Sequence, residues 1–318
     1  MVPLRSIRGR IRSVERIRHI TGAMKTVSAI RLMKVQNQVL RFRPYAAKLH
    51  EVVDDLVART TGLQHPLLGA PDPRGQTLRP DVGVCLVLGS DRGLCGSYNN
   101  NLLAEAIQFL QEHCRTRVQL EVLGKKLSDL MAARGCAIGR TFHGVLHDLS
   151  YAQAAELAEN YLARYQDGEI SSLWAIYTQF RTTARQKVTR VQLLPIAAWG
   201  TRAGDDAGRA PRSTSGEMTG DPARPQFSTP LFPEYQYEPD PAAVLGQLLP
   251  LYFKRELWRI LTEARASEHL ARMTAMDMAT INANEMIQRL TLTYNKARQE
   301  AITRELSEIA TASEAFRE

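Results

Sequence analysis

The sequence predicts an α/β protein made of two long terminal helices with an α/β domain inserted between them. Apolar residues recur at coiled-coil spacing over both ends of the 318-residue chain. Strand and helix patterns alternate between about residues 80 and 196. Hydrophobic residues make up 44% and charged residues 23%, which allows a sizeable core and excludes wholesale disorder. No run of about 18 apolar residues occurs, so we expect no membrane span.

The first 60 residues or so are predicted to form one helix. Its apolar side chains fall into three groups with the 3-4-3 spacing of a coiled-coil seam. The groups are Leu4-Ile7-Ile11-Val14, Ile17-Ile20-Met24-Val27 and Leu32-Val35-Val39-Phe42. Steps of three and five residues join the groups, so we expect the stripe to drift around the helix instead of holding one heptad phase. Pro44 is expected to kink or interrupt the helix.

The same N-terminal segment is strongly basic. Residues 1–48 hold twelve Lys or Arg residues and one acid, Glu15, and so carry much of the net charge of +8. A basic rod suits an acidic partner such as a protein face, nucleic acid or lipid headgroups. Aromatic residues are limited to Phe42 and Tyr45, and no recognition module is present, which weakens the case for nucleic acid. A basic rod that runs past acidic protein faces explains the charge as well, and a merely solvated basic face stays open.

The middle of the chain carries the alternating elements. Four apolar runs are predicted strands: Val82–Leu88, Val118–Leu123, Ser172–Phe180 and Val188–Leu194. Helices are predicted at Asn100–His113, from the second strand to Arg134, and at Tyr151–Tyr165. This alternation favours a small parallel or mixed sheet. Residues 197–230 are rich in Gly, Pro, Ser, Thr, Arg and Asp and are expected to form a flexible surface loop.

A second long helix is predicted from about Pro241 to Ala312. Its seam keeps 3-4 spacing throughout: Met273, Met276, Thr280, Ala283, Ile287, Leu290, Tyr294, Ala297 and Ala301. A second row places small residues four apart, which lets a partner helix approach closely: Ala271, Ala275, Ala279 and Ala283. Helices of about 57 and 70 residues would be about 85 and 105 Å long, more than one domain can bury. We therefore expect the two helices to pair with each other as a rod.

The segment Gly89–Gly96 has the position of a phosphate-binding loop, because it follows a strand and precedes a helix. It matches neither GxGxxG nor GxxxxGK[ST], so we expect a structural turn and no nucleotide binding. Asp91 beside Arg92 is a candidate internal ion pair. A nucleotide-dependent enzyme would need ATP or NAD to bind at this loop.

No other pattern predicts catalysis or a bound cofactor. His143 and His147 are four apart but lack the acid of an HExxH motif, and they are expected to be ordinary surface or core residues. The four cysteines form no CxxC pair and lack zinc-ligand spacing, so small buried side chains in a reducing compartment are expected: Cys85, Cys95, Cys114 and Cys136. The Arg-rich N-terminus is typical of a transit peptide, but the helix pattern from Leu4 leaves no room for one.

Several motifs together resemble one family, the gamma subunit of the F-type rotary ATP synthase of the bacterial type. They occur in order over nearly the whole chain: Ile17–Lys25 (IRHITGAMK), Arg43–Ala46 (RPYA), Ser90–Gly96 (SDRGLCG), Tyr235–Pro241 (YQYEPDP), Ala266–Met276 (ASEHLARMTAM) and Tyr294–Ile309 (YNKARQEAITRELSEI). The last segment is the longest and most specific. Because the family tolerates RPYA in this helix, the resemblance removes the objection that Pro44 raises.

The resemblance implies an α/β fold, with a long antiparallel coiled coil of N- and C-terminal helices and an inserted Rossmann-like α/β domain. The implied domains are residues 1–60, 61–240 and 241–318. The implied role is a non-catalytic rotor shaft that couples proton or sodium flow through the c-ring to ATP synthesis or hydrolysis. Implied partners are the alpha and beta subunits, the epsilon subunit and the c-ring, at the cytoplasmic face of the bacterial plasma membrane. The alternative is a basic coiled-coil protein that binds nucleic acid.

The resemblance also assigns contact residues. Contacts with a beta subunit are implied for Met24, Lys25, Gln299, Thr303 and Glu305. Contacts near the c-ring loops are implied for Tyr235, Tyr237 and Glu238. Three features depart from the family pattern. Gly22 replaces the usual Lys, and Ser97-Tyr98 follows GLCG where the family often has Gly-Leu. The long 197–230 loop contains no Cys, which excludes a thiol switch there.

Overall fold

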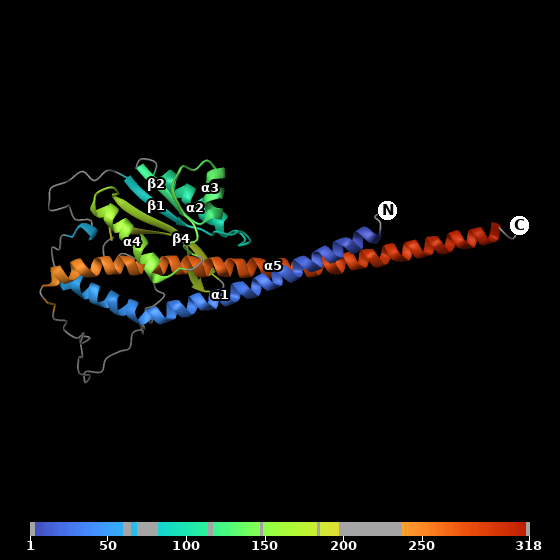
Figure 1. Cartoon of the computed structure of the whole chain (residues 1–318), viewed down its shortest axis with the longest axis horizontal. Coiled ribbons are helices and arrows are strands. Elements are labelled where there is room, and N and C mark those ends of the chain that lie inside the picture. Colours follow the sequence, from blue (N-terminus) through green and yellow to red (C-terminus); the bar gives the residue numbers. More distant parts are fainter. Residues whose placement is uncertain are drawn as a thin grey trace, which may run out of the picture.

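The structure, a computed structural model, describes residues 4–59, 65–68, 82–113, 117–146, 149–182, 185–196, 237–238 and 240–315. Two long helices, α1 (Leu4–Arg59) and α5 (Pro241–Ala315), lie side by side as a rod, and an α/β domain packs against one half of it (Figure 1). Both helices match the predicted ranges within a few residues. No helix among the described residues is both long and apolar enough to cross a membrane.

The domain contains one five-stranded sheet in the order β3-β2-β1-β4-β5. The strands are β1 (Val82–Leu88), β2 (Arg117–Leu123), β3 (Ile138–Phe142), β4 (Ser172–Thr182) and β5 (Arg185–Leu194). The first four are parallel and β5 is antiparallel to β4, so the predicted mixed sheet is confirmed. The short edge strand β3 was not predicted, because Gly139, Arg140 and Thr141 are exposed and leave no apolar alternation to detect.

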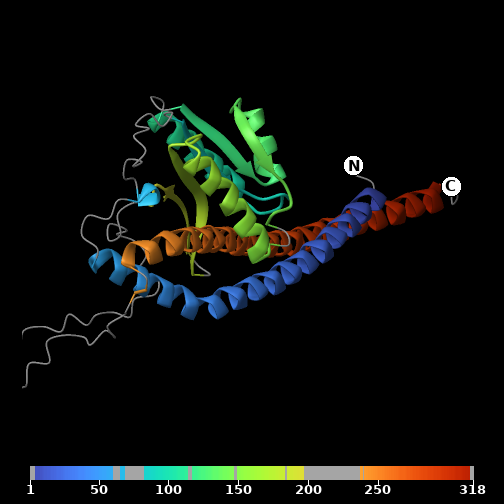
Figure 2. The ribbon, with the colours of Figure 1, turned by 60° about the vertical axis from the view of Figure 1, so that its left-hand side comes forward.

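Helices cover both faces of the sheet (Figure 2). On one face, Cys85 and Val87 of β1 pack with α2 (Tyr98–Glu112) and α3 (Lys125–Ala133). On the other face, Val84, Leu86 and Leu88 pack with α4 (Tyr151–Gln166) and with α5. Alternation along a buried parallel strand therefore makes two cores. The core on the α5 face also takes in Leu49, Val53 and Leu56 of α1, which joins the rod to the domain.

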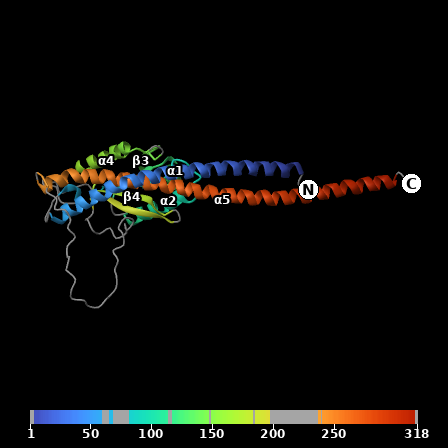
Figure 3. The same cartoon turned by 90° about the horizontal axis from the view of Figure 1, so that it is seen from below.

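The two long helices run antiparallel, as expected. Arg8 Nη2 donates a hydrogen bond of 2.7 Å to Tyr294 Oη, and Lys25 Nζ lies 2.6 Å from Asp277 Oδ1. Viewed from below, α5 continues past the N-terminal end of α1 as a single helix (Figure 3). Helix α1 continues through Pro44 to Arg59, so the interruption suggested by Pro44 alone does not occur, as the RPYA resemblance implied.

The expected drifting stripe of α1 is also wrong. Between Ile7 and Val35, the buried positions of α1 follow one seven-residue repeat that includes Thr21 and Ser28. The predicted seam residues Ile17, Ile20 and Val27 are 53%, 60% and 49% exposed. A helix that stays paired along its length keeps one heptad phase. Ile17, Ile20 and Val27 are out of phase with this repeat and therefore face outward. The polar residues Thr21 and Ser28 occupy the seam between the two helices instead.

The predicted seam of α5 is confirmed. Met276 and Ala283 are buried, and Ile287, Leu290 and Tyr294 are half-buried. The intervening apolar residues Met286 and Leu292 are 52% and 71% exposed. The regular 3-4 spacing of this helix therefore predicted the correct face.

Candidate functional site

The middle of the rod combines polar seam contacts with the Ser90–Gly96 loop of the domain. Thr21 Oγ1 and Thr280 Oγ1 share a hydrogen bond of 2.8 Å across the two helices. Next to them, Lys25 pairs with Asp277, and both side chains are about half exposed at 45% and 44%. Arg18 Nη1 donates to Asn284 Oδ1 over 3.4 Å. Exposed pairs of this kind contribute little stability, but they fix which side chains face each other.

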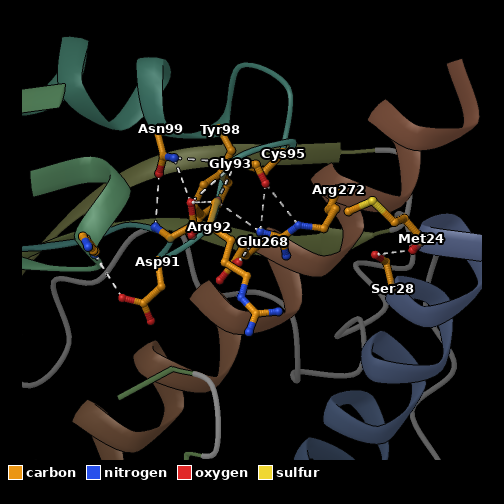
Figure 4. Close-up of polar contacts among 12 residues, drawn as sticks. Met24, Ser28, Asp91, Arg92, Gly93, Cys95, Tyr98, Asn99, Glu268 and Arg272 are labelled. Carbon is orange, nitrogen blue, oxygen red and sulfur yellow. Dashed lines mark hydrogen bonds and ion pairs between the residues drawn. The ribbon is translucent and has the colours of Figure 1, made fainter. Parts of the chain in front are cut away.

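Met24 and Lys25, two of the implied beta-subunit contacts, belong to this region. Met24 is half-buried, and its thioether extends from α1 toward Arg272 of α5 (Figure 4). Its carbonyl accepts a 2.8 Å hydrogen bond from the buried Ser28 hydroxyl. Met24 therefore faces the junction of α1, α5 and the loop, while the Lys25 ammonium stays within reach of solvent and of an external partner.

The loop is organised by its own Asp91. The carboxylate accepts hydrogen bonds from the backbone amides of Lys125 (3.0 Å) and Gly144 (3.1 Å). The first of these amides is at the N-terminus of α3, the helix that follows β2, whereas the helix that follows the loop itself is α2. Asp91 thus ties the loop to the start of α3 and to the turn at Gly144. The suggested pairing of Asp91 with Arg92 gives way to these backbone contacts, and Arg92 is exposed.

Two glycines allow the strand ends to meet below this loop. A Cβ at Gly89 would lie 2.3 Å from Leu127 Cδ2. Gly124 has a φ of +111°, and a Cβ there would lie 2.7 Å from the Gly89 carbonyl carbon. Gly89 therefore leaves room for the Leu127 side chain, and Gly124 allows the two backbone segments to approach closely, which supports the predicted structural turn.

Arg272 of α5 attaches the loop to the rod. Its Nη2 donates to the carbonyl oxygens of Arg92 (3.2 Å) and Gly93 (3.4 Å), and to Glu268 Oε1 (2.7 Å). Burial raises the pKa of Glu268, and the adjacent Arg272 guanidinium opposes this shift. Sequence reasoning did not single out either residue, although both belong to the ASEHLARMTAM motif.

The other implied contact residues lie far from this junction. Gln299, Thr303 and Glu305 are exposed on the part of α5 that continues beyond α1, together with the exposed Ile302 and Leu306.

At the opposite end of α5, Glu238 is exposed. Tyr237 is partly buried and packs against the core on the α5 face of the sheet. Tyr235 lies outside the described residues. The implied contacts among the described residues therefore lie in three places. These are the middle of the rod (Met24 and Lys25), its tip (the part of α5 beyond α1) and its foot (the start of α5 with Tyr237 and Glu238).

Within the described residues, no group of three or more His, Cys, Asp or Glu could hold a metal ion. His143 is exposed, and His147 and Cys114 lie outside the described part of the chain. Cys85 and Cys95 are buried free thiols, as expected, and Cys136 is half-buried. The 197–230 loop also lies outside the described residues.

Comparison with known proteins gives a consistent result over the full length. A family model described as ATP synthase matches residues 3–316. The ATP synthase gamma chain of Heliobacterium modesticaldum is 38% identical over 309 residues, which cover 97% of each chain. That of Anaeromyxobacter sp. (strain Fw109-5) is 39% identical over 322 residues, which cover 100% of each chain.

Two cryo-EM structures share the architecture. A chain of the Euglena gracilis mitochondrial ATP synthase (OSCP/F1/c-ring, rotational state 3) has a TM-score of 0.60 and 19% identity, covering 98% of this chain and 94% of that one. A chain of the Tetrahymena thermophila mitochondrial ATP synthase central stalk and c-ring has a TM-score of 0.53 and 18% identity, covering 82% and 99%. At this identity the likeness concerns the fold.

Proposed function

The chain belongs to the family of ATP synthase gamma chains, and we propose that it is the central rotor shaft of an F-type ATP synthase. In this role it couples proton or sodium flow through the c-ring to conformational change at the nucleotide sites of an alpha3-beta3 ring. The rod of α1 and α5 carries the proposal, because its tip continues as an exposed single helix. A long paired-helix rod is suited to transmitting torque within a surrounding ring.

A rotor must offer different contacts to successive partners, since equal affinity for all states shifts none of them. The rod supports this requirement by its asymmetry. Exposed Ile17, Ile20 and Val27 lie on α1 together with all twelve basic residues of segment 1–48. Exposed apolar side chains are typical of surfaces that a partner protein covers, because contact with the partner removes them from water.

The beta subunits are the proposed partners of two places on the rod. Met24 and Lys25 would meet them at mid-height, and Gln299, Thr303 and Glu305 would meet them at the tip. The exposed polar side chains at the tip support this role, because they are available for hydrogen bonds to a surrounding subunit. Lys25 would exchange part of its pairing with Asp277 for a partner carboxylate, at small cost given its exposure.

The foot is proposed to face the membrane side. Tyr235, Tyr237 and Glu238 would lie near the c-ring loops, with the epsilon subunit bound nearby. The exposure of Glu238 and its place at the end of α5 opposite to the tip support this orientation. The chain would then be a peripheral part of a complex at the cytoplasmic face of the bacterial plasma membrane.

The shaft is proposed to be non-catalytic, with nucleotides bound by the ring subunits. The support comes from the Ser90–Gly96 loop, which matches neither nucleotide-binding pattern and whose Asp91 instead ties it to the backbone amides of Lys125 and Gly144. The alternative of a nucleic-acid-binding protein finds no support among the relatives, which are ATP synthase gamma chains.

Co-expression with alpha and beta subunits tests the proposal. The expected product is a complex that hydrolyses ATP and contains one copy of this chain. A cysteine at Gln299 should cross-link to a beta subunit, whereas a cysteine at the exposed Arg134 of the globular domain should not. A chain that stays outside the alpha-beta assembly, or that binds DNA with strong salt dependence instead, would overturn the proposal.

A further inference from the structure

The Ser90–Gly96 loop adopts a backbone conformation that its own sequence does not favour. Leu94 has a φ of +63°, in the left-handed region that disfavours residues with a Cβ. Its side chain is 61% exposed, so burial of Leu94 does not compensate for this strain. Such a conformation persists only where surrounding contacts impose it.

The contacts that hold the loop in this conformation come from the domain and from the rod. From the domain, Asn99 Nδ2 donates to Ser90 Oγ (2.7 Å) and Asn99 Oδ1 accepts from the Ser90 amide (3.1 Å). From the rod, the guanidinium of Arg272 reaches two successive carbonyls, those of Arg92 and Gly93, directly before Leu94. Figure 4 shows this guanidinium between the loop and Glu268.

Arg272 is itself fixed in place. It is 8% exposed, and its charge-assisted bond to Glu268, one turn earlier on α5, orients the guanidinium toward the loop. A lysine at this position would keep the charge but present a single nitrogen in place of the two, Nε and Nη2, that contact the loop. Nη2 contacts all three acceptors, and the additional 3.4 Å contact from Nε to the Gly93 carbonyl is the one that an ammonium would lose.

We propose that Arg272 is a positioning residue that makes the conformation of the Ser90–Gly96 loop follow the shaft helix α5. Glu268 supports it by holding the guanidinium. The loop then moves with the rod as one body and is not an independent flexible turn of the domain. The structural part of this inference stands by itself, and its consequence for rotation rests on the proposed function.

Two native thiols distinguish opening of the loop from unfolding of the domain. Cys95 is 3% exposed, with its Sγ 3.5 Å from Ser90 Oγ and 3.9 Å from the Arg92 carbonyl, so it is enclosed by the loop. Cys85 is fully buried in β1, where burial raises the pKa of its thiol to about 12. Opening of the loop should expose Cys95 alone, whereas unfolding of the domain exposes both.

The experiment measures alkylation of each cysteine by iodoacetamide in the purified full chain, with peptide mass spectrometry to separate the sites. We expect Arg272→Gln to accelerate the alkylation of Cys95 by about tenfold or more. The loss of hydrogen bonds to a charged group shifts a local opening equilibrium by that order. Cys85 should stay unreactive. Arg272→Lys should give a smaller acceleration, and Glu268→Gln should lie between wild type and Arg272→Gln.

Arg259→Gln is the matched control, since Arg259 forms ion pairs with Glu256 and Glu263 earlier on the same helix. It should leave Cys95 unchanged. An unchanged Cys95 rate in Arg272→Gln would overturn the proposal, as would equal acceleration of Cys95 and Cys85. Should Arg272→Gln fail to fold, the Glu268→Gln variant decides by the same two rates.

A second arm addresses the rotary consequence. In the assembled complex, Arg272→Gln should lower ion pumping per ATP hydrolysed while leaving assembly intact. Failure to assemble even with the wild-type chain would count against the proposed function, whereas normal assembly with undiminished pumping would count against loop positioning as a contributor to coupling.

Discussion

A lysine at Ala283 tests whether the paired seam of α1 and α5 is needed for torque. Ala283 is 6% exposed and lies in the part of the seam where Arg18 of α1 contacts the adjacent Asn284. A lysine there would bring an extra side chain into a close contact and place a second cation beside Arg18. A glutamate would be a poorer test, because it could pair with Arg18.

The size of the effect follows from two terms. Overpacking a close contact costs about 1–3 kcal/mol. Full burial of an unpaired ammonium would cost several kcal/mol more, but the seam of a two-helix rod is near water, and the long lysine stem can carry the charge outward. We therefore expect a loss of about 3 kcal/mol in helix pairing, or roughly a hundredfold in the pairing equilibrium.

The assay is ATP-driven ion pumping by the assembled complex, measured beside denaturant unfolding of the full chain. Asn282→Lys is the control, because Asn282 is adjacent in sequence but exposed. Ala283→Lys should lower both the unfolding midpoint and pumping, while Asn282→Lys should change neither by much. Equal effects of the two lysines would refute the seam argument.

Three further predictions concern ion pairs elsewhere in the chain. Arg164→Met should destabilise the chain by about 3–5 kcal/mol in denaturant unfolding. It removes the cation 2.8 Å from Oε1 of the fully buried Glu121 and leaves the carboxylate with the Tyr161 hydroxyl as a hydrogen-bond donor; adding Glu121→Gln should recover much of this loss. A double-mutant cycle of Lys25 with Asp277 should give a coupling of about 1 kcal/mol or less that falls with added salt, because both side chains are about half exposed; a large, salt-independent coupling would contradict this. The raised pKa of Glu268 means that the folded chain binds this proton more tightly than the unfolded chain, so the resulting stabilisation is complete below the ordinary value of 4.5 and is lost as pH rises through the folded pKa. Wild type should therefore lose stability relative to Glu268→Gln over that range in unfolding titrations, and a constant difference would argue against the shift.

Local patterns predicted most of the elements correctly. Apolar runs located β1, β2 and β4, because parallel strands buried on both faces read as nearly continuous apolar segments. The antiparallel edge strand β5 was located from its C-terminal part, Val188–Leu194. The 3-4 spacing of α5 located its seam for a similar reason, since one unbroken period leaves a single face to bury. The edge strand β3 escaped detection because its middle residues face solvent.

The candidate site was predictable only in part. The motifs pointed to Met24, Lys25 and the Ser90–Gly96 loop, but nothing in their spacing connects the loop with Arg272, which lies some 180 residues later and donates to the Arg92 carbonyl. Backbone carbonyls carry no sequence signature, so a side chain that binds them is found only when the chain folds. The same holds for Asp91, whose partners are backbone amides of two distant turns.

The sequence alone determined that both ends of this chain are long helices around an α/β domain, because helical period and strand alternation are local properties. Only the tertiary structure decided which face of α1 meets α5. Hydrophobicity favoured Ile17 and Ile20, yet Thr21 and Ser28 are buried. The paired rod must keep one heptad phase from Ile7 to Val35, and that geometric constraint outweighs the preference of single side chains for burial.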